Sequence, residues 1–246
     1  MTKILAHRGN SEVAPENTMA AFKSAVDAGA DGVELDVQLS KDGVPVIFHD
    51  EKLNRITGAK GYLKNYTYKQ LRELDCGAWF SDKFIDSKIS SLEETLDFFK
   101  NTEGIYLNIE LKNGMVKYPN IEEKVIKLIK SFELMDRTIV STFNQKSLIK
   151  VKEVEPEIKT GLLYRAKIYK SWEYAKELIN ADAIHPNYFS ISENEVKQAH
   201  KNNIKVNVYT VDKEKDIKRF INWGVDILIT NCVQKAKRIR TEIVNY

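Results

Sequence analysis

Short apolar runs alternate with longer amphipathic segments along nearly the whole chain, and this alternation limits the possible folds more than any single motif does. The apolar runs with the length and composition of β-strands are 3–9, 32–37, 105–112, 137–143, 159–164, 181–188, 205–210 and 226–231. The segments between them repeat apolar residues every three or four positions, which predicts helices at 16–29, 91–102, 121–134, 145–154, 170–180, 193–203, 213–224 and 232–243. Strands that alternate with helices favour a parallel sheet with helical crossovers.

Eight strand–helix units predict a closed (β/α)8 barrel, and an open doubly wound sheet is the alternative. The chain has 246 residues, of which 43% are hydrophobic, enough for one large core. A barrel of this kind forms a single domain of about this length. We therefore expect one barrel domain over residues 1–246.

The stretch after the second predicted strand departs from the alternation. It reads "QLSKDGVPVIFHD", and Asp42-Gly43 is typical of a two-residue hairpin turn because glycine adopts positive φ at no steric cost. A turn centred on this pair places Asp36 opposite His49. The hairpin would then rise above the barrel rim and return His49 to the level of Asp36.

Residues 51–90 follow the hairpin and contain no clear strand–helix unit. Their glycines and aromatic residues predict a small subdomain inserted over one mouth of the barrel. The rest of the chain shows neither an internal repeat nor a low-complexity segment.

Two pairs of charged residues lie at the predicted carboxyl ends of strands. Glu34 and Asp36 share one strand face, as do Glu110 and Lys112, because side chains two apart point the same way. Unpaired carboxylates inside a barrel are costly, so a cation must compensate them. Glu34, Asp36 and Glu110 suit one Mg²⁺ or Ca²⁺ ion, both of which prefer oxygen ligands, better than zinc. Pairing with lysine or arginine in a structural network is the alternative.

The chain has four histidines, and two of them lie near these acids. His7 ends the first predicted strand and His49 ends the hairpin. Cleavage of a phosphodiester needs a base and an acid, and histidine serves as either near neutral pH. Arg8 offers a planar set of donors suited to phosphate or carboxylate. His185 could face the barrel mouth or pack internally, and His200 is expected on a helix surface.

The overall composition excludes several classes of function. A formal charge of +3, from 38 basic and 35 acidic residues, gives no nucleic-acid footprint. Cys76 and Cys232 form no metal-binding spacing and are expected to be buried free thiols. The N-terminal "MTKILAHRGN" lacks the apolar region of a signal peptide, and no run reaches the ~20 apolar residues of a membrane span. We expect a soluble cytoplasmic protein; the oligomeric state is not readable.

The sequence resembles the glycerophosphodiester phosphodiesterases. "HRGN", then "PENTMAAFKSAVDAGADGVELDVQLSKDGVPVIFHD", matches the signature of that family without a gap from His7 to Asp50. Further family motifs follow in order: "LNIELK" (107–112), "STF" (141–143), "VYTV" (208–211) and "GVDILITN" (224–231). The resemblance therefore covers nearly the whole chain.

This resemblance implies a TIM barrel with a small subdomain at about 51–90, and a divalent metal. The implied reaction is hydrolysis of a glycerophosphodiester, such as glycerophosphocholine or glycerophosphoethanolamine, to sn-glycerol 3-phosphate and an alcohol. The roles implied are metal binding by Glu34, Asp36 and Glu110, acid–base catalysis by His7 and His49, and phosphate binding by Arg8 and Lys112. The sequence does not say which histidine is the base, nor whether water or the substrate's 2-hydroxyl attacks first.

Two aromatic residues are further candidates for substrate contact. Tyr209 occupies a position where the family often has tryptophan, and it could pack on the glycerol moiety, as could Phe143. Ordinary core packing explains both residues equally well. In "PENT" (15–18), Pro15 fits a helix start and Asn17-Thr18 can cap the helix, so a structural role is favoured for this motif. Glu16 and Asn17 are candidates only for the rim of the site.

Two rival functions remain open at this stage. A lysophospholipase D or a phospholipase C-like enzyme would need an apolar rim, which aromatic residues of 51–90 could form, although the core of a small subdomain explains them as well. A barrel that binds a phosphorylated metabolite without turnover would not need both histidines and three acids. The preferred substrate is thus a small glycerophosphodiester, with the head-group alcohol undetermined.

Overall fold

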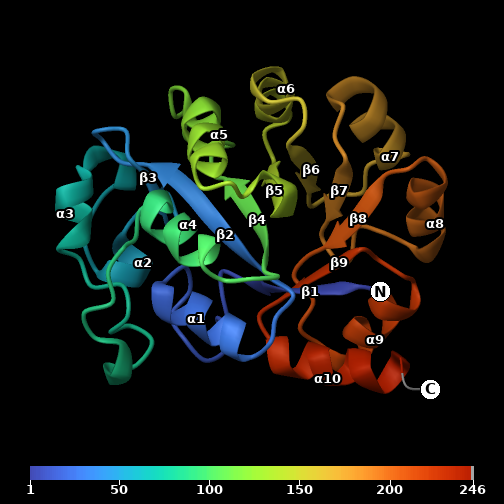
Figure 1. The fold of residues 1–246 in the computed structure, drawn as a ribbon, viewed down its shortest axis with the longest axis horizontal. Coiled ribbons are helices and arrows are strands. Elements are labelled where there is room, and N and C mark those ends of the chain that lie inside the picture. Colours follow the sequence, from blue (N-terminus) through green and yellow to red (C-terminus); the bar gives the residue numbers. More distant parts are fainter. Residues whose placement is uncertain (245–246) are drawn as a thin grey trace.

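The computed structural model describes residues 1–244, and the strands in that part form one sheet closed on itself (Figure 1). The strands are β1 (Lys3–His7), β2 (Gly32–Leu39), β3 (Pro45–Ile47), β4 (Tyr106–Leu111), β5 (Thr138–Thr142), β6 (Lys159–Tyr164), β7 (Ala183–Pro186), β8 (Lys205–Val208) and β9 (Ile227–Thr230). All except β3 are parallel to their neighbours, and β1 pairs with both β2 and β9, which closes the barrel. The predicted eight-stranded barrel is confirmed, and the open sheet is wrong.

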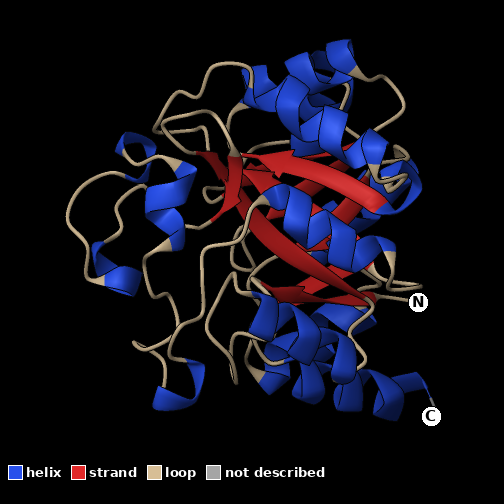
Figure 2. Ribbon diagram, turned by 60° about the vertical axis from the view of Figure 1, so that its left-hand side comes forward, coloured by secondary structure: helices blue, strands red, loops and turns tan. Residues whose placement is uncertain are grey.

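Helices surround this sheet on its outer face (Figure 2). Those between or after barrel strands are α1 (Met19–Asp27), α4 (Leu92–Lys100), α5 (Ile121–Ser131), α6 (Gln145–Val154), α7 (Ser171–Glu173), α8 (Glu193–Lys201), α9 (Glu214–Asn222) and α10 (Val233–Val244). The segment predicted as one helix over 170–180 is instead α7 followed by the π-helical η4 (Tyr174–Ile179). A short 3-10 helix, η3 (Met135–Arg137), leads into β5. The predicted domain ends at residue 246, two residues beyond the described part.

The core lies mainly between the barrel and its helices. All eight residues of β2 are buried, as expected for a parallel strand covered on both faces. Val33, Leu35 and Val37 belong to the same cluster as Phe22 of α1 and Phe99 of α4. Every second residue of the strand therefore supports the helical layer, which leaves the alternate positions to fill the barrel interior.

The hairpin of β2 and β3 has a different register from the predicted one. Val37 pairs with Ile47, so the N–H of Phe48, and not of His49, donates to the carbonyl oxygen of Asp36 at 3.0 Å. The turn contains the three residues 41–43 because Ser40 N–H bonds to Val44 O, and Gly43 has a φ of +79°. The prediction that Asp36 lies opposite His49 is therefore wrong by one residue.

The segment 51–90 lies beside the end of this hairpin (Figure 1). It contains α2 (Asn54–Thr57), η1 (Leu63–Asn65), α3 (Tyr68–Arg72) and η2 (Asp82–Phe84). Its buried Leu53, Leu63 and Leu71 pack in one cluster with Val46 and Phe48 of the hairpin. The insertion thus shares its core with the hairpin that presents His49.

Both cysteines are free and buried, as expected. Among residues 1–244, no helix has the length and apolar composition needed to cross a bilayer.

Candidate active site

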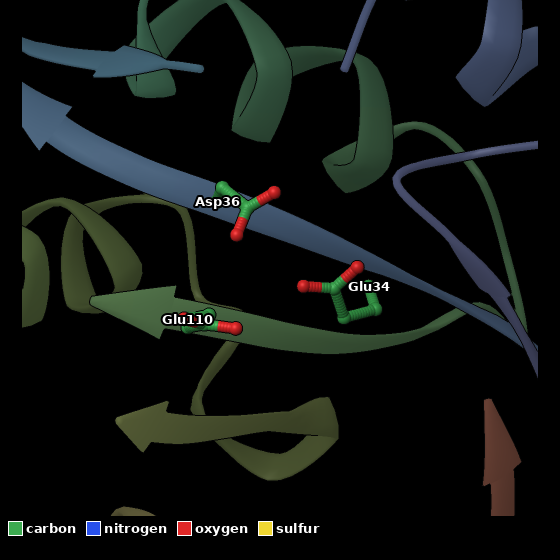
Figure 3. A group of neighbouring side chains, drawn as sticks. All are labelled: Glu34, Asp36 and Glu110. Carbon is green, nitrogen blue, oxygen red and sulfur yellow. The ribbon is translucent and has the colours of Figure 1, made fainter. Parts of the chain in front are cut away.

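Strands β2 and β4 bring three carboxylates together inside the barrel (Figure 3). Asp36 pairs with Glu110 across the two parallel strands, and Glu34 lies two residues before Asp36 on the same face. One carboxylate oxygen from each residue lies within 4.8 Å of the others. All three side chains are buried. Strand β2 continues to Leu39, two residues further than predicted, because it pairs there with β3.

Two cationic side chains compensate part of this negative charge. Lys112 Nζ lies 2.8 Å from Glu110 Oε1 and 3.6 Å from Asp36 Oδ1, and Arg8 Nε lies 3.4 Å from Asp36 Oδ2. Glu34 Oε2 accepts a backbone N–H bond from Arg8 at 2.9 Å. Within residues 1–244, no lysine or arginine side chain approaches Glu34 to 4.0 Å, so the structural ion-pair network leaves one buried acid without a countercharge.

The pKa directions of the three acids reflect this imbalance. Burial, together with the charges of Asp36 and Glu110, raises the pKa of Glu34 well above its usual value. Burial opposes ionisation of Asp36 as well, but Lys112 and Arg8 hold the pKa of Asp36 below its usual value. Burial also raises the pKa of Glu110 despite the neighbouring Lys112. A set of buried carboxylate oxygens that the nearby cations compensate only in part fits a hard divalent cation.

His7 has a partner that defines its tautomer. Asn231 donates through its side-chain nitrogen to Asp212 at 2.7 Å, so its Oδ1 is left to accept from His7 Nδ1 at 2.8 Å. Nε2 of His7 therefore carries the free lone pair, and it lies 3.9 Å from Glu34 Oε2. Burial and the charge of Arg8 lower the pKa of His7 to about 4, which keeps the ring neutral near pH 7.

His49 has a charged partner instead. Its Nδ1 lies 2.6 Å from Asp50 Oδ1, and Arg55 of α2 donates to Asp50 Oδ2 through Nε at 2.7 Å. Arg55 also donates two bonds to Glu16, at 2.7 and 2.9 Å, and Arg8 donates to Glu16 at 2.9 Å. A chain of alternating charges therefore connects His49, through the insertion, to the arginine beside Asp36.

In the loop after β1, Asn17, named from the sequence only as a candidate for the rim, contacts a proposed metal ligand. Asn17 Nδ2 donates to Asp36 Oδ2 at 2.8 Å, and the N–H of Asp36 donates to Asn17 Oδ1 at 3.2 Å. Thr18 caps α1 by accepting from Ala21 N–H, as expected, whereas the Asn17 side chain contacts Asp36. Arg8 and Asn17 both have a φ of +56°, which a strand–helix pattern does not reveal.

A cleft of about 900 Å³ opens beside the carboxylates. Four predicted site residues line it: His49, Glu110, Lys112 and Phe143. The ring of Tyr209 meets that of Phe143 edge-on with centroids 6.2 Å apart, and the Tyr209 hydroxyl donates to Tyr164 O at 3.1 Å. Phe143 therefore lines the cleft, and Tyr209 contacts its ring without belonging to the lining.

The remaining histidines lie away from the cleft. His185 is fully buried, and its Nε2 lies 2.7 Å from Asn207 Nδ2 inside the barrel. His200 is on the surface of α8, 2.8 Å from Asp226 Oδ2, as the sequence predicted. Within the described residues, neither side chain forms a hydrogen bond or ion pair with Glu34, Asp36 or Glu110.

Comparison with known proteins places the chain among enzymes that share this barrel. The model of the glycerophosphoryl diester phosphodiesterase family matches residues 7–235. A glycerophosphodiester phosphodiesterase of Caldanaerobacter subterraneus is 44% identical over 230 residues, which is 94% of each chain. One from Bacillus altitudinis is 41% identical over 245 residues, covering 99% of this chain and 100% of the relative.

Solved structures give the same result. A phosphodiesterase of Oleispira antarctica, in complex with the product sn-glycerol-3-phosphate, superposes with a TM-score of 0.85 at 30% identity, covering 97% of this chain and 96% of that one. The fold and these comparisons define the chain as an α/β-barrel enzyme that hydrolyses phosphoric diesters. Within that class, it belongs to the glycerophosphoryl diester phosphodiesterase family.

Proposed function

We propose that the chain hydrolyses glycerophosphodiesters, such as glycerophosphocholine and glycerophosphoethanolamine, to sn-glycerol 3-phosphate and an alcohol, with a divalent metal and two histidines. The observation that carries this proposal is the group of three buried acids, with His7 Nε2 3.9 Å from Glu34 and His49 lining the same cleft as Glu110. Such a group suits chemistry at a phosphorus atom, where negative charge grows on the oxygens as the bond to the alcohol breaks.

Glu34, Asp36 and Glu110 would hold the metal, and their all-oxygen donor set favours Mg²⁺ or Ca²⁺. When bound, the ion supplies Lewis acidity toward a phosphoryl oxygen. Arg8 and Lys112 are held at the edge of the cluster by Asp36 and Glu110, and their remaining N–H groups would bind the other phosphate oxygens.

The contacts of the two histidines favour different roles. The neutral amide of Asn231 holds His7 with its Nε2 lone pair free, the form that accepts a proton from the nucleophile. The carboxylate of Asp50 contacts His49 Nδ1 and fixes the ring, and His49 lines the cleft through which the alcohol half of the diester would leave. We therefore assign His7 as the general base and His49 as the general acid, for attack by water or by the substrate's 2-hydroxyl through a cyclic phosphate.

A lipid-directed activity, of the lysophospholipase D or phospholipase C type, is the second candidate. It is favoured by apolar side chains of the insertion that face solvent, since Trp79 is 43% exposed and Ile85 is 54% exposed. Because these residues lie outside the set that lines the cleft, we expect lysophosphatidylcholine to be a poorer substrate than glycerophosphocholine. The cytoplasmic location stays a prediction from the sequence.

The test is an assay of sn-glycerol 3-phosphate release from glycerophosphocholine and glycerophosphoethanolamine. We expect EDTA to abolish release, and Mg²⁺ or Ca²⁺ to restore it, because without the metal the three acids repel the phosphate and do not stabilise its charge. Folded protein loaded with either ion that released nothing from either diester would contradict the assignment, and lysophospholipids would then be tested.

Metal affinity is expected to increase with pH. The pKa of Glu34 is raised in the metal-free protein. At any pH between the ordinary carboxyl pKa, about 4.5, and this raised pKa, metal binding must therefore displace the proton of Glu34. Affinity should level off above that value, where Glu34 is already ionised. Calorimetric titration of Mg²⁺ in two buffers of different ionisation enthalpy measures the released proton. Equal heats in both buffers over this pH range would show that Glu34 binds no proton before the metal arrives.

A further inference from the structure

The cleft beside the proposed metal site carries more positive charge than a glycerophosphate group requires. Beyond Lys112, its lining includes the cations Lys117, Lys146 and Arg165, against two acids, Glu51 and the proposed metal ligand Glu110. Among residues 1–244, no carboxylate lies within 4.0 Å of the charged group of any of these three cations. They are exposed, and their charges are therefore available to a ligand.

Arg165 lies over the aromatic ring in the cleft against which an ammonium head group would pack. Its guanidinium carbon lies 5.7 Å from the ring centroid of Phe143, the aromatic residue that lines the cleft. Choline and similar cations are recognised by aromatic rings that surround them, helped by negative charge. Here the ring face already has a cation beside it, and two lysines stand nearby, so a positively charged head group meets repulsion.

The two halves of the substrate make different demands on this cleft. The phosphodiester's single negative charge is met by Arg8, Lys112 and the proposed metal, and the glycerol half is neutral. Additional cations therefore serve neither the phosphate nor the glycerol. Their natural complement is a negative charge on the alcohol half of the diester, because a cleft lined by one sign of charge concentrates ligands of the opposite sign.

We propose that the enzyme prefers glycerophosphodiesters whose alcohol carries its own phosphate or phosphodiester group over those with choline, ethanolamine or a neutral polyol. The inference rests on the proposed function and names its substrate class. The net reaction is unchanged: one water is consumed, the bond from phosphorus to the alcohol oxygen breaks, and that oxygen gains a proton. The products are sn-glycerol 3-phosphate and the anionic alcohol.

A matched set of three diesters tests this preference. Glycerophosphocholine has a cationic head group, glycerophosphoglycerol a neutral one, and the fully deacylated form of cardiolipin adds a second phosphodiester to the neutral one. We expect kcat/KM for release of sn-glycerol 3-phosphate to be about 10-fold higher for the deacylated cardiolipin than for glycerophosphoglycerol, per scissile bond, at low salt. The advantage should shrink as ionic strength increases.

Substitutions connect that preference to the cleft. In Lys146→Gln and Arg165→Gln, both exposed sites, the ratio of kcat/KM for the anionic to the neutral diester should fall severalfold, and further in the double variant. Lys197→Gln is the control: Lys197 is equally exposed but pairs with Glu193 on α8, so its ratio should match the wild type.

Different outcomes would overturn the head-group preference and the phosphodiesterase function. Equal or faster turnover of glycerophosphocholine, or a ratio that the cleft substitutions leave unchanged, would overturn the head-group inference while the phosphodiesterase function stands. If none of the three diesters released sn-glycerol 3-phosphate from metal-loaded protein, the proposed function itself would fail.

Discussion

Replacing His49 with glutamine is expected to lower kcat for release of sn-glycerol 3-phosphate by about 10²- to 10⁴-fold, the usual contribution of a general acid or base. Glutamine keeps a polar side chain beside Asp50 but has no proton to donate at neutral pH. Because the His49 side chain is a quarter exposed, the substitution should leave folding intact. The loss should therefore appear in kcat more than in KM.

His200→Gln is the matched control, because His200 also contacts a carboxylate but lies on the surface of α8 away from the cleft. Its activity should be that of the wild type. A substrate whose leaving group needs no proton, such as a nitrophenyl ester of glycerol phosphate, should regain most of the lost rate in His49→Gln. Equal losses on both substrates would contradict the role of general acid.

Replacing Glu34 with glutamine is expected to remove the metal response while sparing the metal-free fold. Glutamine has the shape of the protonated acid, and the raised pKa means that the buried site favours the neutral form. The metal-free variant should thus melt at the same temperature as the wild type or above it at pH 8. Activity should fall by more than 10- to 100-fold, which is the usual cost of losing a residue that only hydrogen-bonds to a metal ligand.

Differential scanning fluorimetry with EDTA and with Mg²⁺ or Ca²⁺ distinguishes these effects. The wild type should gain thermal stability on metal addition, because a ligand that binds the folded state alone stabilises it. Glu34→Gln should lose that gain. Asp216→Asn removes a buried carboxylate outside the site and should keep it. A metal-induced gain of wild-type size in Glu34→Gln would exclude Glu34 as a ligand.

The acids were predictable because they depend on two simple regularities. Strand side chains alternate faces, which places Glu34 and Asp36 together, and neighbouring parallel strands end at the same rim, which adds Glu110. These rules require no knowledge of the loops. The family resemblance supplied the histidine roles in addition, and those roles remain proposals.

What escaped prediction depends on loop conformation and long-range pairing. The hairpin register changed by one residue because its turn holds three residues instead of two. The contact between Asn17 and Asp36 requires positive φ at Asn17, and the Arg55 contacts with Glu16 and Asp50 require the insertion to lie against the barrel. Neither leaves a periodic pattern in the sequence, so structure alone reveals them.

The pairing of β1 with β9 has a consequence for how the site is assembled. The three acids lie within the first 110 residues, but Asn231, the partner of His7, follows the last strand. The proposed base is therefore held in one tautomer only when the first and last strands pair, whereas the three acids need only β2 and β4 to come together.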